Sequence, residues 1–371
     1  MRLLLATVFA VSPAGVSGDP SCNRPLPTAP AGLPSRVLVT TQCGTYGVDP
    51  DGRVAVAKPK PFEKSPWRVA LRGGHLVLIE HGRAVWRSRR TFGREIGSIQ
   101  SIAVGRRALA FSFDDRRLWV SRLAGKEHVV ARGEAALGWT AHDELVTLIW
   151  SRHTPYRGTL FVRGPDGTYR RHLASRVVGT EFEDSAGILI YTTADGLLSR
   201  TDGATVTRLA DLIAYGIDPT AAWPELLDGG LIAFQGRDRI VVLHPDGTLF
   251  GSAGFGGSAP VNWRSWPAAG APGVAFVVGD PDGHESVYLL RDADTRARLL
   301  FRAMADLNPC GGGAASWHGN WLLYANQQGN VAALEATGAH APVLLTDTAA
   351  RLPGVDGEPG WLTGFSDAAW S

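Results

Sequence analysis

Five aromatic and imidazole side chains are the best candidates in this sequence for contacting a ligand. Trp139 and His142 precede one apolar run, and Trp317 and His318 precede another, so the two pairs occupy equivalent places in the chain. Trp263 adds a further indole in the C-terminal half. An imidazole can exchange a proton near neutral pH, and an indole face can stack on a sugar or anchor a peptide. We predict that loops carrying these five residues line a binding site.

The motifs of well-known catalytic and metal sites do not occur in this sequence. It has no GxSxG nucleophile elbow, no HxH or HExxH spacing and no CxxC pair. Two acidic pairs, Glu181 with Glu183 and Asp143 with Glu144, have the residue type needed for acid–base chemistry. Their expected place in loops makes a solvated pair the simpler interpretation. The sequence therefore predicts no catalytic residue, no metal and no cofactor.

Tight turns recur at a nearly constant interval, and this period is the main information about the fold. The interval is roughly forty residues, the length of a four-stranded β-propeller blade. In several turns Gly follows Asp, because glycine accepts the positive φ that a tight hairpin needs. The expected turns lie at Asp51-Gly52, near Ser88, at Gly125, Asp166-Gly167, Asp202-Gly203 and Asp246-Gly247, near Asp292 to Asp294, and at Thr337-Gly338.

Each repeating unit of roughly forty residues contains several strand-like runs that are separated by turns. The second run of each unit is almost continuously apolar. Examples are residues 109–113, 188–191 and 321–324. Such a run is typical of a strand buried on both faces, here between the sheets of adjacent blades. Fourth runs are more polar, as expected of an outer edge. We predict an all-β chain that forms a single β-propeller of four-stranded blades over residues 35–371.

The first strand-like run of several units has a second repeated pattern, an aromatic residue followed by small and acidic residues. It occurs in Trp139-Thr-Ala-His-Asp143 and in Phe182-Glu-Asp-Ser-Ala-Gly187. With the apolar strands and Asp-Gly turns, this pattern resembles the TolB-like, WD40-like propeller repeat, whose usual form is an aromatic, Ser-Pro-Asp-Gly, an apolar strand, Asp-Gly and another strand. The resemblance covers about residues 35 to 371, but no unit keeps an intact Ser-Pro-Asp-Gly tetrad. It implies a propeller fold and a tendency toward binding or scaffolding.

The two ends of the chain fit together as one blade. Residues 360–370 have the pattern of a first strand with nothing after it, whereas the opening unit near Arg36 lacks its own first strand. The C-terminal strand would complete the first blade and close the ring, which protects the seam that an open propeller exposes. We predict eight blades of about 42 residues each. Seven is the alternative, because the unit at residues 66–94 is short and lacks a glycine turn.

The N-terminus is typical of an exported protein. Arg2 is followed by a mostly apolar run and then by small residues and breakers, so residues 1–18 are predicted to be a signal peptide and residues 19–34 an N-terminal arm. The apolar run is too short to span a membrane, and no later run reaches the roughly twenty residues required. We therefore expect a secreted or extracytoplasmic protein without a transmembrane segment.

Three cysteines suit an exported chain with one disulfide and one spare thiol. Cys43 lies in the first unit and Cys310 at the start of the last, so a bond between them would staple the seam. A bond from Cys22 to Cys43 would instead hold the N-terminal arm. Sequence alone leaves both pairings open.

A basic stretch stands out against the net charge of +2. Between Lys58 and Arg132 there are seventeen Lys and Arg against six Asp and Glu. This sector could contact an anionic envelope polymer, although such charges also occur on solvent-facing strands that bind nothing. Nucleic acid is disfavoured as a partner by the predicted export and by the absence of a recognition motif.

Together these features predict a monomeric binding or scaffold module for an envelope protein or an extracellular or cell-wall glycan, without catalytic activity. The alternative is a lyase or hydrolase that acts on a polysaccharide or small polar substrate in the central channel. An enzyme needs several ionisable side chains that converge with displaced pKa values. A binding surface needs an exposed aromatic or charged patch.

Overall fold

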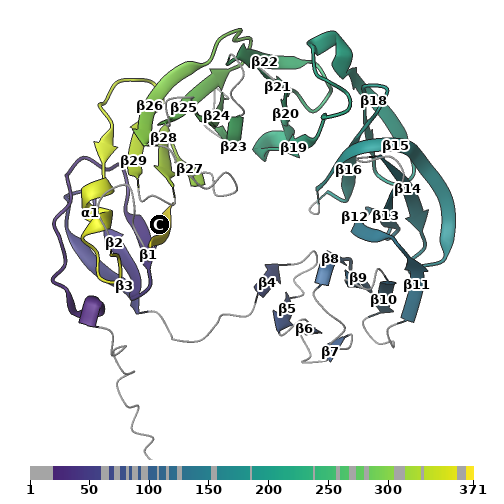
Figure 1. Ribbon diagram of the computed structural model, residues 1–371, viewed down its shortest axis with the longest axis horizontal. Coiled ribbons are helices and arrows are strands. Elements are labelled where there is room, and N and C mark those ends of the chain that lie inside the picture. Colours follow the sequence, from purple (N-terminus) through teal and green to yellow (C-terminus); the bar gives the residue numbers. More distant parts are fainter. Residues whose placement is uncertain are drawn as a thin grey trace, which may run out of the picture. The chain divides into compact units, whose positions relative to one another are not determined.

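A computed structural model gives the fold of the chain (Figure 1). The structure describes residues 20–59, 67–70, 76–80, 83–85, 91–92, 99–106, 108–113, 117–122, 128–151, 157–183, 186–236, 239–255, 260–266, 273–279, 284–304, 314–326, 330–356 and 365–371. The chain divides into two compact units. One contains the described parts of Met1–Glu63, Asp282–Ser286 and Leu300–Ser371, and the other contains those of Lys64–Pro281 and Val287–Leu299.

The unit that contains both ends of the chain has two four-stranded sheets among its described residues. Their strand orders are β3-β2-β1-β31 and β27-β28-β29-β30. The strands are β1 (Val37–Thr41), β2 (Gly44–Val48), β3 (Val54–Pro59), β27 (Ala314–His318), β28 (Trp321–Ala325), β29 (Val331–Glu335), β30 (Val343–Leu344) and β31 (Phe365–Trp370). The helices are the 3-10 turn η1 (Pro20–Asn23) and α1 (Thr346–Ala350), which follows β30.

The second unit contains sheets of the same kind. Their orders are β4-β5-β6-β7, β11-β10-β9-β8, β12-β13-β14-β15-β16-β17-β18 and β19-β20-β21-β22. The strands are β4 (Trp67–Ala70), β5 (Leu76–Glu80), β6 (Arg83–Val85), β7 (Thr91–Phe92), β8 (Ile99–Val104), β9 (Ala108–Phe113), β10 (Arg117–Arg122), β11 (His128–Arg132), β12 (Ala135–Trp139), β13 (Leu145–Trp150), β14 (Gly158–Arg163), β15 (Tyr169–Glu183), β16 (Ile188–Thr193), β17 (Leu197–Thr201), β18 (Val206–Asp211), β19 (Pro224–Leu226), β20 (Ile232–Gln235), β21 (Arg239–Leu243) and β22 (Leu249–Gly254). Two 3-10 turns, η3 (Leu212–Tyr215) and η4 (Asp228–Gly230), flank β19.

A further sheet has the order β23-β24-β25-β26. Its strands are β23 (Pro260–Trp266), β24 (Gly273–Gly279), β25 (His284–Arg291) and β26 (Arg298–Met304). In this sheet, as in the others, consecutive strands are neighbours, and every strand pair whose register is described is antiparallel, for example β23 with β24. The described chain is therefore a series of short meanders connected by turns.

The seven-stranded sheet consists of two meanders that share one strand. Figure 1 shows β15 as a single long strand between β14 and β16. Its first part pairs with β14, where Tyr169 lies opposite Arg163, and its second part pairs with β16, where Glu181 lies opposite Ile190. The last strand of one meander thus continues without a break as the first strand of the next.

The predicted apolar runs form strands that are buried on both faces. Phe111 in β9 and Phe276 in β24 are fully buried, and Phe276 shares one apolar cluster with Phe250 of the preceding sheet. A second cluster joins Ile190 of β16 to Phe234 of β20 in the same way. Each such side chain contributes about 1.5–3 kcal/mol through burial. Packing of sheet against sheet therefore supplies the core, as the sequence predicts.

The predicted turns are confirmed wherever the structure describes them. Glycines at these turns have positive φ between 82° and 95°. They are Gly52, Gly167, Gly203, Gly247 and Gly338. Ala293 adopts φ 63° in the turn at Asp292 to Asp294, which has no glycine. The predicted turns near Ser88 and at Gly125 lie outside the described residues.

The C-terminal strand belongs to the first sheet, as predicted. Val37 of β1 pairs with Trp370 of β31, and Val39 pairs with Ala368. The Trp370 indole N–H also donates to the Ser316 carbonyl of β27 (3.0 Å). The described part of this strand begins at Phe365, since residues 357–364 lie outside the description.

These repeated four-stranded antiparallel meanders, packed face to face within each unit, are the sheets of a β-propeller. The all-β propeller class predicted from the sequence is therefore confirmed. The number of blades, eight or seven, and the closure of the ring stay predictions.

The N-terminal arm is held by a disulfide between Cys22 and Cys43, whose Cα atoms are 5.4 Å apart. Backbone N–H groups of Ala29 and Gly32 donate to carbonyls of the β2–β3 turn (both 2.9 Å), and Leu33 is buried in the core beside β1. The arm therefore brings Cys22 back to the β1–β2 turn. This pairing corrects the alternative Cys43–Cys310 bond, because Cys43 is already engaged.

The arm also contacts the segment that follows α1. Arg24 donates to the Val355 carbonyl (3.0 Å) and to the Asp356 carboxylate (2.9 Å). Gly354 lies so close to Cys43 that an added Cβ would be 2.5 Å from its sulfur. The disulfide, an ion pair and a tight backbone approach thus tie the arm into the first unit.

Several sequence predictions fall largely outside the described residues. They are the signal peptide at residues 1–18, the thiol of Cys310 and most of the basic stretch from Lys58 to Arg132. No described helix has both the length and the apolar character needed to cross a membrane.

Loss of the arm disulfide is expected to destabilise the protein measurably. The bond closes a loop between residues 21 positions apart. We expect Cys22→Ser to lower the free energy of unfolding by about 3 kcal/mol, because the cross-link restricts the unfolded chain. Urea unfolding with and without reductant measures this change. Cys310→Ser is the matched control and should unfold like the wild type; an equal loss in that control would contradict the assignment.

Candidate functional site

Two of the predicted site residues lie in the second unit, and they have different environments. Trp139, at the end of β12, is only 3% exposed, and its indole N–H donates to the Ala103 carbonyl (3.1 Å). It packs in an apolar cluster with Leu145. His142 lies on the following turn, exposed, with Nε2 3.7 Å from the Asp202 carboxylate. Trp139 is thus a core residue, which corrects its prediction as a ligand-contacting side chain.

The other predicted residues lie in β27 and β23. Trp317 is half-buried and His318 is exposed, and the His318 ring lies 5.6 Å from that of Trp370. Trp263 is within β23, and its side chain is outside the described part of the structure. None of the four predicted residues whose side chains are described lines the cleft described below.

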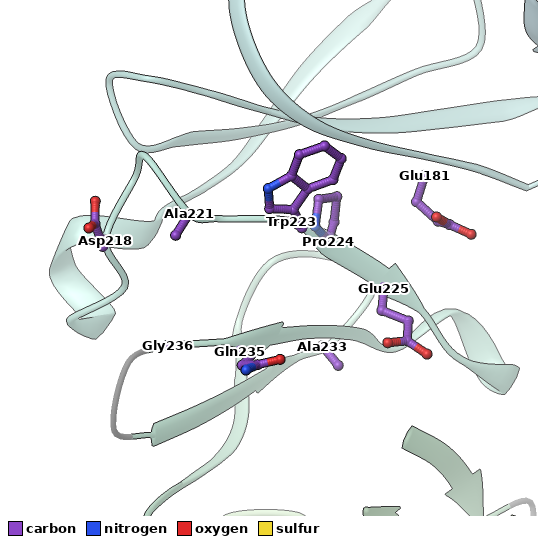
Figure 2. Close-up of a pocket in the computed structure, with 9 residues that line it drawn as sticks. All are labelled: Glu181, Asp218, Ala221, Trp223, Pro224, Glu225, Ala233, Gln235 and Gly236. Carbon is purple, nitrogen blue, oxygen red and sulfur yellow. The ribbon is translucent and has the colours of Figure 1, made fainter. Parts of the chain in front are cut away.

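A cleft of about 860 Å³ opens in the second unit where two consecutive meanders meet (Figure 2). Glu181 of β15 contributes from the first strand of one meander, and Pro224 and Glu225 contribute from the first strand, β19, of the next. The lining residues are Glu181, Asp218, Ala221, Trp223, Pro224, Glu225, Ala233, Gln235 and Gly236. The volume is within the usual range for pockets that hold small molecules.

Two exposed indoles meet beside this cleft. Trp223 is 46% exposed and Trp150, the last residue of β13, is 38% exposed. Their ring centroids are 5.7 Å apart with the planes tilted by 34°. In Figure 2 the Trp223 indole stands on the opposite side of the cleft from Gln235 of β20. Indoles presented in this way combine a large apolar surface with few rotatable bonds, which suits ligand contact.

Buried neighbours on both sides hold Trp223 in place. Ala222 is completely buried, and Pro224, also buried, restricts the backbone and pairs with Phe234 of β20. Gly179 allows the close approach of β15, because a Cβ there would lie 2.7 Å from Pro224 Cδ and 2.8 Å from the Ala222 oxygen. The exposed indole is therefore carried on a rigid base.

A buried hydroxyl joins the two meanders under the indole. Thr192 of β16 is completely buried. Its Oγ1 accepts from the Gly179 N–H (3.1 Å) and donates to the Ala222 carbonyl (2.5 Å). This one side chain thus satisfies a donor on β15 and an acceptor in the segment that carries Trp223. Because buried polar groups must be paired, the hydroxyl fixes the position of that segment.

The lining of the cleft has acidic side chains from three parts of the chain. Asp218 lies in the loop before β19, where its carboxylate accepts from the Thr220 backbone N–H (2.8 Å) and hydroxyl (2.7 Å). These two bonds, the backbone bond first, lower the pKa of Asp218 below its ordinary value. Glu181 and Glu225 add carboxylates to the same lining. Among the described lining residues none is basic.

A second hollow of about 380 Å³ has a different character. Its lining includes Arg200, Arg208, Asp202 and Asp246. The backbone N–H of Thr205 is the main cause that lowers the pKa of Asp202 to about 2. Acid and base alternate around this hollow, so its charges balance locally. No group of three or more His, Cys, Asp or Glu side chains in the described residues is arranged to hold a metal ion.

The contact between Trp150 and Trp223 could not be predicted from the sequence. Trp150 ends an apolar run and so has the pattern of an ordinary strand residue, and Trp223 lies in a loop whose contacts are not local. The one available signal was Trp-Pro at residues 223–224, outside every predicted apolar strand. Glu181 was identified as a carboxylate, but it was paired with Glu183 instead of with the acidic groups across the cleft.

Comparisons with known proteins concern the fold alone. No known protein family and no curated protein matches the sequence. Among solved structures, apo AztD from Citrobacter koseri is 12% identical, with 89% of this chain and 99% of that chain covered and a TM-score of 0.46. The C-terminal WD40 domain of Sif2 is 14% identical over 84% and 96%, with a TM-score of 0.45. BamB from Moraxella catarrhalis is 14% identical over 84% and 97%, with a TM-score of 0.42. Likeness at this level says nothing about ligand or activity.

Removing the Thr192 hydroxyl is expected to destabilise the meander junction. Thr192→Val keeps the shape but leaves the Gly179 N–H and the Ala222 carbonyl without their partner. We expect a loss of about 1–3 kcal/mol in the free energy of unfolding, with a shifted indole emission from Trp223. Urea unfolding followed by fluorescence measures both. Thr192→Ser retains the hydroxyl and should lose less; if Val were tolerated better than Ser, the bridge would not matter.

The charge of Asp218 is expected to depend on Thr220. In Thr220→Val the hydroxyl donor is gone, so the pKa of Asp218 should rise toward its ordinary value of 3.8. Because the folded-state pKa is lowered, the stabilisation from this carboxylate is present above pH 3.8 and is lost as the pH falls through the folded-state value. NMR titration of the side-chain carboxyl carbon between about pH 2 and 6 measures the pKa.

Thr248→Val is the matched control, because Thr248 makes the same pair of bonds to Asp246. This variant should raise the pKa of Asp246 and leave that of Asp218 unchanged. An unchanged Asp218 titration in Thr220→Val would show that the hydroxyl bond does not set the charge.

Proposed function

We propose that this protein is an exported, non-catalytic binding module, and that its ligand is held at the cleft beside Trp150 and Trp223. The observation that carries the proposal is the exposed Trp223 indole on a base of buried residues. An exposed aromatic of this size normally costs solubility, so its rigid presentation beside a cleft favours a contact role. The proposed partner is an envelope protein or an extracellular glycan.

The proposed location outside the cytoplasm is supported by covalent structure. The Cys22–Cys43 disulfide persists in oxidising compartments and is rare in the cytosol. The N-terminal sequence, with Arg2 before an apolar run and small residues, has the pattern of an export signal. Both features fit a module that acts in the cell envelope or beyond it.

A polysaccharide lyase or hydrolase is the second candidate. The observation that favours it is that Glu181 and Glu225 line one cleft, since paired carboxylates can act as acid and base. The two functions differ in what happens to a bound glycan. An enzyme cleaves it, whereas a binding module releases it unchanged.

Truncation of the exposed indole is expected to abolish most ligand binding without affecting the fold. We expect Trp223→Ala to weaken binding at least about tenfold, because an aromatic side chain that anchors a ligand is worth a few kcal/mol. The measurement is surface plasmon resonance of the purified chain against soluble peptidoglycan fragments, chitooligosaccharides and short envelope-type peptides. Tyr169→Ala, which removes another exposed aromatic 57% accessible on β15, is the matched control and should bind normally.

Two results would contradict this proposal. Equal binding by Trp223→Ala and the wild type would place the ligand elsewhere on the surface. Release of reducing ends from a polysaccharide by the wild type, lost in Glu181→Gln and in Glu225→Gln, would establish the enzyme instead.

A further inference from the structure

The lining of the cleft combines apolar and polar side chains. In Figure 2 Glu181 and Glu225 lie toward one end of the cleft and Asp218 toward the other, with Trp223 and Pro224 between them. The apolar residues are Ala221, Trp223, Pro224 and Ala233, with Trp150 packed against Trp223. The polar residues are Glu181, Asp218, Glu225 and Gln235. A neutral, uniformly hydroxylated ligand makes no use of the carboxylate charges in this lining. A ligand with a long apolar stem and a polar end matches it.

The indole pair favours a cation at that polar end. The face of an indole is the most favourable aromatic surface for a guanidinium or ammonium group. The described partners of the Asp218 carboxylate are the backbone N–H and the hydroxyl of Thr220, and both are neutral. The negative charge of Asp218 can therefore attract a cationic ligand. Glu181 and Glu225 bring further carboxylate oxygens to the same lining, whatever other contacts each makes.

From this complementarity we infer that the cleft takes an arginine side chain from a segment of a partner protein. The inference rests on the proposed function and identifies its ligand. The aliphatic stem would lie along Pro224, and the guanidinium would lie against the Trp223 indole, facing Glu181 and Glu225. Arginine suits this site better than lysine, because its planar group stacks on aromatic rings and binds carboxylates in a bidentate manner.

A protein segment fits better than an aminated glycan. An amino sugar carries its charge directly on the ring, without a flexible apolar stem to cover the apolar part of the lining. An arginine carries its charge at the end of three methylene groups. These can cover apolar lining residues while the guanidinium contacts the carboxylates. The volume of about 860 Å³ leaves room for the flanking backbone of the partner.

Short peptides that differ only in charge test the inference. The probes are acetyl-Gly-Arg-Gly amide, the same peptide with citrulline in place of Arg, the Lys peptide and a glucosamine oligomer. Binding to the full chain is followed through the indole N–H signals of Trp150 and Trp223 in NMR titrations. We expect the Arg peptide to bind about tenfold more tightly than the citrulline peptide, and more tightly than the Lys peptide or the sugar. Raising the salt from about 20 to 200 mM should weaken binding of the charged probes and leave the citrulline peptide unaffected.

Charge-neutral variants locate the effect. Asp218→Asn should weaken binding of the Arg peptide about threefold, and the double variant Glu181→Gln with Glu225→Gln about tenfold, whereas the citrulline peptide should respond to neither. Asp246→Asn is the matched control, because Asp246 has the same turn chemistry outside this cleft. It should leave binding unchanged.

The outcomes separate this inference from the proposed function. If chitooligosaccharide binds in a Trp223-dependent manner while the acidic variants have no effect, the binding module stands and the arginine inference is wrong. Equal affinity for the Arg and citrulline peptides, or tighter binding of the glucosamine oligomer, also overturns it. If no probe binds and Trp223→Ala changes no measured interaction, both are wrong.

Discussion

Where the structure describes their side chains, the sheets of this protein carry apolar residues on both faces, and these must be buried against neighbouring sheets. Phe250 and Phe276, from consecutive sheets, show this constraint directly, because each is fully buried in a cluster to which both sheets contribute. A single meander in water would expose half of its core. The stability of every other feature, including the cleft, depends on this packing between neighbours.

The same constraint explains why repeated residues say little about function. Apolar second strands and glycines at tight turns recur because each meander needs them. Trp139 belongs to this class, since its indole packs beside Leu145 and donates to a backbone carbonyl of the preceding sheet. The residues at the cleft do not recur. Thr192, Gly179 and Trp223 together form a junction that the structure describes at one place, between β15 and β19.

A structural feature could be predicted from the sequence when the interactions that determine it are between residues close together in the chain. Strands and turns are local, so the positive φ of Gly52 or Gly247 could be predicted from Asp-Gly alone. The pairing of β31 with the first sheet could be predicted for a different reason. The opening unit lacked a first strand, and the C-terminal segment had the pattern of a first strand with no strand after it. The partner of Cys43 stayed open, since it depends on the path of an arm with no regular pattern. The Trp150–Trp223 contact was missed, because it joins a strand end to a loop far away in the chain, and an indole in the sequence does not show whether it is buried.

The paired indoles at the cleft are the proposed contact surface of the protein. Hydroxyl-radical footprinting of individual tryptophans, with and without saturating acetyl-Gly-Arg-Gly amide, tests this proposal. We expect rapid oxidation of Trp150 and Trp223 in the free protein, slow oxidation of the buried Trp139, and selective protection of the first two by the peptide. Unchanged oxidation of Trp223 under saturation, or protection confined to other aromatic residues, would contradict it.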